Sequence, residues 1–320
     1  MTSQAKCINS RLGGARGILI STVLTAAVFM AAIYLSDELG GYVEDALLLS
    51  VKIIIPSLFP FLILTDLIMP YLRFDIFPPA GRIFERVFKI NGGAISVFIC
   101  GIVCGFPIGA KLAYDAYRRG AISRDECERL MAFSNNAGPS YVISAVGASV
   151  RGSVSDGIIL YLSMVASSIL TGMIIGIKSK KSELFELNIE QKYNFIDSIK
   201  NTARISINVT AFICTFGIFV GLTKTVIKNE VLRAVSISLL EIGNAAVYLA
   251  GSSELPRLFT LTLTSFSISF SGLSVILQTL SIQEKESVAN AKLYVSRKLM
   301  QGVISSVITV IIYLITVSQF

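Results

Sequence analysis

Long uncharged stretches alternate with short charged ones along almost the whole chain. Nine runs of about 18 to 25 residues carry little or no charge, which is the length that a helix needs to cross a membrane. Within them, only Asp66 and Glu241 carry a full charge. The runs are 18–35, 53–72, 91–110, 130–150, 157–177, 205–223, 234–253, 258–282 and 302–320. This pattern predicts an all-α polytopic membrane protein.

Composition agrees with this class of protein. Hydrophobic residues make up 53% of the 320 positions, charged residues only 15%, and the mean hydropathy is +0.70. These values exclude an ordinary soluble domain. The first run is too long for a signal peptide, and no cleavage pattern follows Tyr34. We therefore expect it to be retained as a membrane-spanning helix.

Two of the runs, 91–110 and 234–253, hold helix-breaking or charged residues, and we interpret them as re-entrant segments. Seven full crossings then remain, with the N-terminus in the cytoplasm. The cytoplasmic segments hold 22 of the 28 lysines and arginines and are 1–17, 73–129, 178–204 and 283–301. The positive-inside rule supports this orientation. It also accounts for the net charge of +7 without nucleic acid as a partner.

Two stretches between the crossings are amphipathic. Residues 74–90 and 193–204 place apolar side chains at helical spacing among basic ones. This pattern predicts helices that lie in the cytoplasmic interface of the membrane. The mixed charges of 178–192 predict a solvated linker.

The sequence also repeats itself weakly. A shift of 134 residues aligns Gly105–Ile143 with Leu239–Leu277. Each half has an Ile-Gly pair in its re-entrant segment, followed 29 residues later by a glycine in an interrupted crossing. An odd number of crossings separates the starts of the two units, which predicts that the second is inverted. Inverted repeats with interrupted helices are typical of transporters, although a duplication kept only as scaffold is the alternative.

These features divide the chain into four parts. We predict an N-terminal tail with the first transmembrane helix (1–42) and a first repeat (43–177). A cytoplasmic linker (178–192) leads to a second repeat that includes the C-terminal helix (193–320). Each repeat is expected to contain a re-entrant helical hairpin and an interrupted transmembrane helix.

Two ionisable residues lie deepest in the predicted hairpins. They are Glu241 and Lys111, and removing either one alone from water is costly. The repeat alignment suggests that they approach one another. One interpretation makes Glu241 a carboxylate that binds solute or proton, with Lys111 as counter-charge or anion anchor. The alternatives are a structural ion pair, or a Lys111 side chain that reaches the cytoplasmic face.

The residues expected to form a substrate-binding site share one property: each is polar or interrupts a helix inside an apolar segment. Amides and hydroxyls recognise neutral polar solutes, and freed backbone carbonyls can coordinate sodium. Such residues also pack membrane helices together, which is the alternative. The predicted site residues are Pro107, Gly109, Lys111, Asn135, Asn136, Gly138, Ser140, Glu241, Asn244, Gly272, Ser274 and Gln278.

Several other chemistries lack support in the sequence. The chain contains no histidine, so the i,i+4 spacing of Cys100 and Cys104 does not indicate a metal site. It has no phosphate-binding loop of the G-x-x-x-x-G-K-[ST] type and no nucleophile elbow. We expect no enzyme, no metal and no resident cofactor, and we leave coupling to Na⁺ or H⁺ open.

Five stretches carry a resemblance to a known family. They are PSLFPFLILTDLI (56–68), CGFPIGAKLAYDAYRRGAIS (104–123), SNNAGPSYVISAVG (134–147), LLEIGNA (239–245) and SGLSVILQ (271–278). They closely resemble the YlbJ family of sporulation integral membrane proteins. That family belongs to the nucleoside-recognition or Gate-domain group, which is similar to spore maturation proteins, the membrane part of ferrous iron transporter B and concentrative nucleoside transporters.

The resemblance implies a location in a bacterial inner membrane and a role in making the spore. It does not imply a known substrate, because fold kinship alone does not fix function. Together with the residues, it predicts a transporter or permease-like protein for a nucleoside-like or small polar solute. The alternative is a non-transporting scaffold or signalling partner in assembly of the spore envelope. Expected partners are the lipid bilayer and a small solute, with a homo-oligomer or other sporulation membrane proteins left open.

Overall fold

The structure is a computed structural model of the chain, and it describes residues 30, 36–68, 78–177, 179, 194–283 and 288–317. Every regular element among these residues is helical. The predicted crossing 18–35 lies outside the described residues apart from Met30, and so does the linker 178–192 apart from Ser179.

The helices fall into two consecutive series. The first contains α2 (Ser36–Leu49), the π-helix η1 (Ser50–Ile54), α3 (Ile55–Ile68), α4 (Pro78–Phe88), the 3₁₀ turn η3 (Gly92–Ala94), α5 (Ile95–Cys104), α6 (Ile108–Arg118), α7 (Arg124–Ser134), the π-helix η4 (Ser140–Val150) and α8 (Val154–Gly176). The second contains α9 (Phe195–Val226), α10 (Glu230–Leu240), α11 (Ile242–Gly251), α12 (Arg257–Phe270), α13 (Gly272–Ser281) and α14 (Ala291–Val317).

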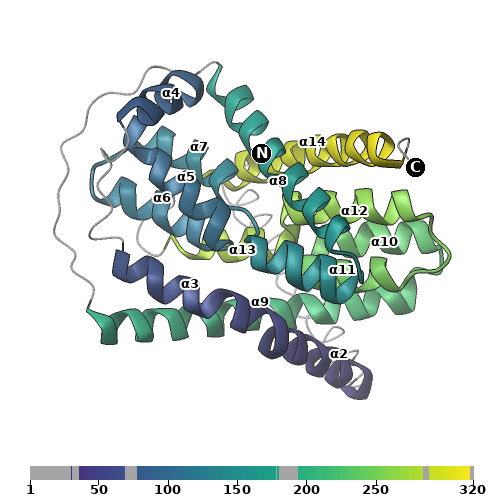
Figure 1. Cartoon of the computed structure of the whole chain (residues 1–320). Helices are drawn as coiled ribbons and strands as arrows, with labels where there is room; N and C mark the ends of the chain where they lie inside the picture. The colour runs from purple at the N-terminus through teal and green to yellow at the C-terminus, as the bar shows by residue number, and fades with distance from the viewer. Residues whose placement is uncertain are drawn as a thin grey trace, which may run out of the picture.

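The same order of elements occurs in both series. A helical hairpin, α5–α6 or α10–α11, is followed by an interrupted helix, α7–η4 or α12–α13, and then by a long helix, α8 or α14. Figure 1 shows α5, α6 and α7 near one end of the molecule and α10 and α12 near the other, with α9 running between. The predicted hairpins and interrupted helices are therefore present, while the inverted orientation of the units stays a prediction.

Five helices are long and apolar enough to cross a membrane. They are Ser36–Leu67, Val154–Gly176, Phe195–Val226, Arg257–Ser281 and Ala291–Thr316. They correspond to five of the seven predicted crossings. A sixth, 130–150, is split by the non-helical residues 135–138 into α7 and η4, as expected for an interrupted crossing. The predicted division between residues 42 and 43 lies within α2.

The first predicted interfacial helix is confirmed as a helix. It is α4, and its axis is bent by 100° from the segment Gly92–Cys104 that follows. Phe84 and Phe88 on one face are buried, whereas Ile83 and Arg86 are exposed. The amphipathic pattern thus reflects packing of the Phe84 face on the protein, with the basic face directed outward.

The second predicted interfacial helix is not a separate element. Residues 195–204 form the first turns of α9, which continues without a break to Val226 over 32 residues. The cap of the whole helix lies at Asn194, whose side chain accepts a hydrogen bond from the Asp197 amide. No helix-breaking residue follows before the crossing, so the amphipathic turns and the crossing form one helix.

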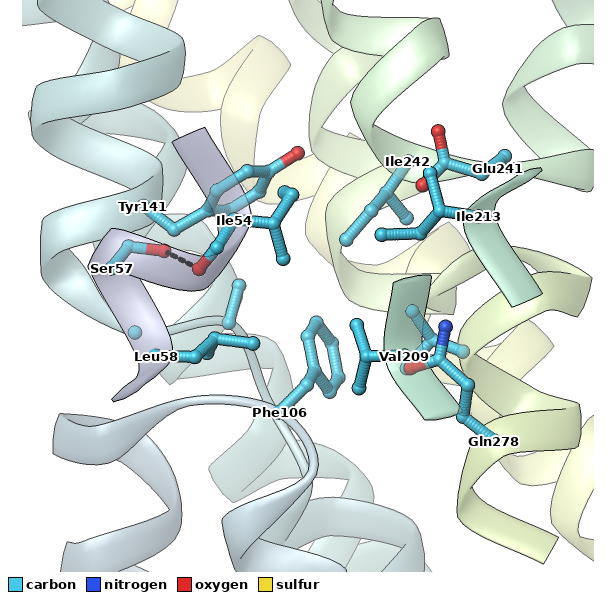
Figure 2. Close-up of a pocket in the computed structure, with 13 residues that line it drawn as sticks. Ile54, Ser57, Leu58, Phe106, Tyr141, Val209, Ile213, Glu241, Ile242 and Gln278 are labelled. Atoms are coloured by element: carbon cyan, nitrogen blue, oxygen red, sulfur yellow. Dashed lines mark hydrogen bonds between the residues drawn. The ribbon is translucent and has the colours of Figure 1, made fainter. Parts of the chain in front are cut away.

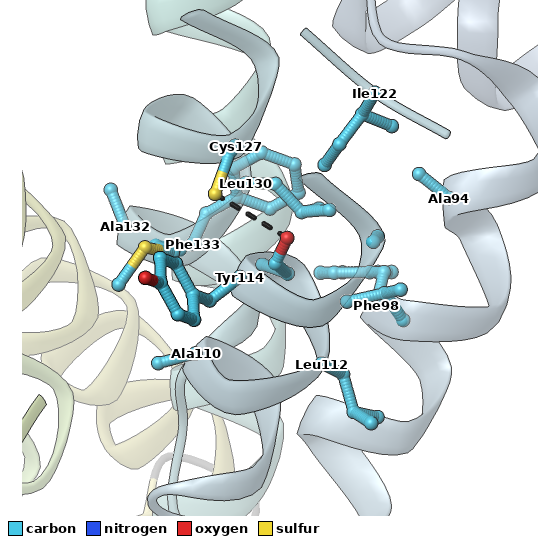
Figure 3. Close-up of a cluster of buried hydrophobic side chains, with 14 of the residues drawn as sticks. Ala94, Phe98, Ala110, Leu112, Tyr114, Ile122, Cys127, Leu130, Ala132 and Phe133 are labelled. Carbon is cyan, nitrogen blue, oxygen red and sulfur yellow. Dashed lines mark hydrogen bonds between the residues drawn. The ribbon is translucent and has the colours of Figure 1, made fainter. Parts of the chain in front are cut away.

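An aromatic cluster holds the first hairpin against α7 (Figure 3). The ring of Phe133 lies 5.1 Å from that of Phe88 and 5.4 Å from that of Phe98, measured between centroids. The Cys127 thiol donates to the Ala113 carbonyl at 3.3 Å within this cluster. Cys127 therefore acts as a small buried side chain.

The last helix turns a polar stripe toward the protein. Leu299, Val303 and Ile311 on its other face are exposed, as expected for side chains that contact lipid. The fully buried members of the stripe recur at helical spacing and are Tyr294, Lys298, Gln301, Ser305 and Thr309. Lys298 belongs to the predicted cytoplasmic segment 283–301, and the structure places it inside a helix, fully buried, because α14 begins at Ala291 rather than near residue 302.

Candidate functional site

A small cavity lies where the two hairpins meet the long helices. Its volume is about 40 Å³. Figure 2 shows Phe106 between Leu58 and Val209, with Tyr141 and Glu241 on opposite sides. The lining residues come from six helical elements and three helix breaks and are Ile54, Ser57, Leu58, Phe106, Ala137, Gly138, Tyr141, Val209, Ile213, Glu241, Ile242, Val275 and Gln278. We call this cavity the central pocket.

The tip of the first hairpin is pressed against the break in the first interrupted helix. Gly105 ends α5 with a φ of 86°, a conformation that favours glycine. A Cβ atom there would lie 2.7 Å from the Gly138 nitrogen. This close backbone contact places Phe106, the next residue, in the central pocket.

The second hairpin meets the second interrupted helix in a similar way. Gly272 has a φ of 64°, and a Cβ atom there would lie 3.1 Å from the Leu240 carbonyl oxygen. Glu241 separates α10 from α11 in an extended conformation. Each interrupted helix therefore supports a hairpin tip at its break, and both tips reach the central pocket.

Glu241 is the carboxylate of the pocket, and it caps a helix. Its oxygens accept hydrogen bonds from the amides of Gly243 at 3.0 Å and Asn244 at 2.6 Å. The Asn244 side chain donates a third bond at 2.9 Å. These bonds fix the carboxyl group at the N-terminus of α11 beside the cavity, and the residue is only 1% exposed.

The far end of the same hairpin is closed by a second carboxylate. Glu230 accepts hydrogen bonds from Tyr248 at 2.7 Å and Ser252 at 3.1 Å. The Tyr248 bond is the main reason that the pKa of Glu230 is lowered. These bonds tie the start of α10 to α11 and fix the hairpin that carries Glu241.

Two further polar side chains line the pocket. Gln278 donates to the Ser274 hydroxyl at 3.3 Å and is 3% exposed. The Tyr141 hydroxyl is buried and, within the part of the chain that the structure describes, has no hydrogen-bond partner. A buried hydroxyl of this kind is normally satisfied, so Tyr141 offers a free donor and acceptor to a molecule in the cavity.

The structure places Lys111 in a different pair from the predicted one. Its ammonium forms an ion pair with Asp66 of α3, and both side chains are buried. The second oxygen of Asp66 accepts from the Asn201 amide at 2.6 Å. The ion pair with Glu241 is therefore not what the structure shows, because Lys111 lies on the side of α6 that faces α3, and Lys111 does not line the pocket.

Asn135 and Asn136 form a network behind the pocket. Asn135 donates to Thr279 at 2.8 Å and to Tyr294 at 3.2 Å. The side-chain oxygen of Asn136 accepts from the Gln301 amide at 2.7 Å. Both asparagines are fully buried, so they join the first break to α13 and α14 rather than line the cavity.

The remaining predicted residues support the pocket without lining it. Pro107 caps α6, and Ser140 begins η4. A Cβ atom at Gly109 would lie 2.2 Å from the Ser134 carbonyl oxygen, so this glycine lets α6 approach α7. Of the predicted set, only Gly138, Glu241 and Gln278 line the central pocket.

Sequence reasoning missed the apolar wall and the buried lysine. Ile54, Leu58 and Val209 lie in ordinary apolar stretches, and nothing in their spacing separates them from core or lipid-facing residues. Lys298 had a signal, because Tyr294, Lys298 and Gln301 recur with a helical period ahead of an apolar run. That polar stripe indicates an inward face and was available from the sequence.

Fold and site together define a multi-pass helical membrane protein with two hairpins and two interrupted helices around a central pocket. The chain is similar to the sporulation integral membrane protein YlbJ of Bacillus subtilis (strain 168), with 23% identity over 92% of this chain and 83% of the relative. This similarity confirms the resemblance that the motifs predicted. No protein-family model matches the chain, and no solved structure gives a significant match.

Proposed function

We propose that this chain is a transporter or permease-like membrane protein that binds a small polar solute in the central pocket. The observation that carries this proposal is the lining of the pocket: both hairpin tips and both interrupted helices contribute to one cavity. Binding at the junction of such segments is typical of transporters, because movement of either hairpin alters access to the site.

The size of the cavity favours a small solute. Its volume of about 40 Å³ has room for about three water molecules. Pockets for drug-sized ligands have volumes of ~300–1,000 Å³. A nucleoside therefore requires the hairpins to move apart, whereas a small polar molecule or ion needs little opening.

The polar side chains of the pocket indicate which hydrogen-bonding groups a matching solute carries. Glu241 accepts hydrogen bonds, while Tyr141 and Gln278 both donate and accept. A solute with at least one donor for Glu241 matches this set. We also propose that the carboxyl group of Glu241 binds the H⁺ or Na⁺ to which transport of the solute is coupled.

The cellular setting follows from the relative. Its name describes a sporulation integral membrane protein, and we extend that role to this chain. We place it in the bacterial inner membrane with the N-terminus in the cytoplasm, as the distribution of basic residues predicts.

Binding to the purified protein tests the proposal. Thermal unfolding is recorded with nucleosides, nucleobases and small anions, for the unaltered protein and for Glu241→Gln and Gln278→Leu. A ligand at about 100 times its dissociation constant adds about 2.7 kcal/mol to stability. We expect at least one compound to raise the unfolding midpoint of the unaltered protein and to lose that effect in both variants.

The matched control is Glu254→Gln, which makes the same change at an exposed position and should keep the ligand effect. Stabilisation that persists unchanged in folded Glu241→Gln and Gln278→Leu would move the site away from the central pocket. No stabilisation from a broad panel would favour the alternative function.

The alternative is a membrane scaffold or signalling partner in spore-envelope assembly. One observation favours it: Asn135 and Asn136, the most polar residues of the first break, are hydrogen-bonded within the protein. Such residues hold helices together. A stable complex with another sporulation membrane protein that is unaffected by Glu241→Gln would support this alternative.

A further inference from the structure

Lys298 is a fully buried lysine in the middle of the protein. Its ammonium donates to the backbone carbonyl of Asn135 at 3.0 Å and to the side-chain oxygen of Gln301 at 2.7 Å. It also lies 5.9 Å from the centre of the Phe106 ring, within the range of a cation–π contact. Two oxygens and one ring therefore surround the three N–H donors.

The partners of this ammonium are all neutral. Among the ion pairs of the described residues, none includes Lys298. A buried charge without an opposite charge is costly. The break at 135–138 leaves the Asn135 carbonyl outside a helix, and this carbonyl accepts from the Lys298 amine in a buried space.

We infer that the Lys298 ammonium fills a cation site at the break of the first interrupted helix, as a built-in replacement for a bound sodium ion. Unwound carbonyls and side-chain amides are the ligands that coordinate sodium in transporters. The two oxygens that accept from Lys298, the Asn135 carbonyl and the Gln301 side-chain oxygen, are neutral ligands of this kind, and Asn136 holds the Gln301 amide in place by accepting a hydrogen bond from it.

The inference goes beyond the proposed solute pocket, since it concerns the break behind that pocket and does not depend on the solute. It has a direct consequence for coupling. A site already filled by a covalently attached cation does not bind and release sodium, so this break does not couple transport to a sodium gradient. Truncation of the lysine should open the site to sodium.

The test compares thermal unfolding of purified full-length protein in sodium chloride and in choline chloride at equal ionic strength. Choline is too large for the site, so the comparison isolates sodium binding from general screening. We expect the same midpoint in both salts for the unaltered protein. For Lys298→Ala we expect a lower midpoint in choline chloride and a rise of several degrees as sodium chloride replaces it.

The control is Lys292→Ala, which makes the same change at an exposed position of the same helix and should respond to neither salt. Lys298→Ser serves as a second variant, because its hydroxyl adds a ligand and should strengthen the sodium effect. Lys298→Ala that unfolds equally in both salts would overturn the inference. Sodium stabilisation of the unaltered protein as large as that of the variant would overturn it too.

This result is distinguishable from failure of the pocket proposal. The sodium response is read without solute, and Glu241→Gln leaves the Lys298 ligands intact. If no solute stabilises the unaltered protein but sodium stabilises Lys298→Ala, only the pocket proposal is contradicted. If a solute stabilises the unaltered protein but sodium does not stabilise Lys298→Ala, only the inference about Lys298 is contradicted.

Discussion

The buried carboxylate of Asp66 is held by specific partners on two other helices. Asp66 on α3 pairs with Lys111 on α6 and accepts a hydrogen bond from Asn201 on α9. These three elements enclose one side of the molecule. In a low-dielectric interior, removal of one partner leaves the other charge without compensation, so this cluster should contribute strongly to stability.

The first prediction concerns this ion pair. Lys111→Met should destabilise the protein by about 3–5 kcal/mol, because Asp66 stays buried without its cation. Asp66→Asn should also destabilise it, while the double variant should lose much less than the sum of the two. Denaturant unfolding of the purified proteins measures all three, with the exposed Lys292→Met as the control. If the destabilisation of the double variant equals the sum of the two single variants, Lys111 and Asp66 do not stabilise one another and the ion pair is contradicted.

At the residue scale, the sequence identifies which positions matter better than it identifies their partners. Lys111, Glu241 and Asn135 were recognised because polar residues in apolar segments are costly. The predicted partner of Lys111, Glu241, is wrong, because a weak repeat alignment does not determine which face of α6 meets which helix. Lys298 was missed because it lies close to the end of an apolar run and resembles a loop residue.

At the scale of the elements, the packing of hairpins against breaks depends on glycine. Gly109 in α6 lies against the end of α7, where the Ser134 carbonyl occupies the space that a Cβ atom would need. A backbone oxygen cannot move aside without a shift of the helix. The contact therefore fixes how closely the first hairpin approaches the first interrupted helix.

The second prediction tests this contact. Gly109→Ala should destabilise the protein by about 1–3 kcal/mol through overpacking and lower its amount in the membrane. Gly251→Ala is the matched control, since nothing lies within 4 Å of its Cβ position, and it should be neutral. Thermal unfolding and the level of membrane-inserted protein measure both. Equal stability and equal membrane levels of Gly109→Ala and Gly251→Ala would contradict the close contact between Gly109 and the Ser134 carbonyl.

The breaks themselves were predictable and the helix ends were less so. Gly105, Pro107, Gly138 and Gly272 interrupt apolar runs, and the structure breaks the helices at or beside them. The starts of α9 and α14 were placed too late. Charged residues such as Lys298 had been assigned to loops, whereas in the structure they continue a helix whose polar side is buried.

At the scale of the whole molecule, the account rests on one cavity shared by two similar sets of elements. The sequence predicted the class, the hairpins and the interrupted helices from hydropathy, from helix-breaking and charged residues inside apolar runs, and from a weak internal repeat. It did not locate the central pocket, because nine of the lining residues are Ile, Leu, Val, Phe, Ala or Gly and differ from lipid-facing ones only in the direction of their side chains. Direction depends on packing between distant segments.

The central claim is that the pocket opens to solute and is not sealed packing. Ser57 lines the pocket, while Ser50 on the same span is fully buried and does not. Each donates its hydroxyl to a carbonyl of its own span, so Ser57→Cys and Ser50→Cys form a matched pair.

The measurement is the rate at which a small charged thiol reagent, methanethiosulfonate ethylammonium, modifies each cysteine in native membranes, with the unaltered protein as background. We predict clear modification of Ser57→Cys, slowed by any compound that stabilises the protein, and none of Ser50→Cys. A Ser57→Cys as unreactive as Ser50→Cys would show that the cavity stays closed to water and would contradict a transporter.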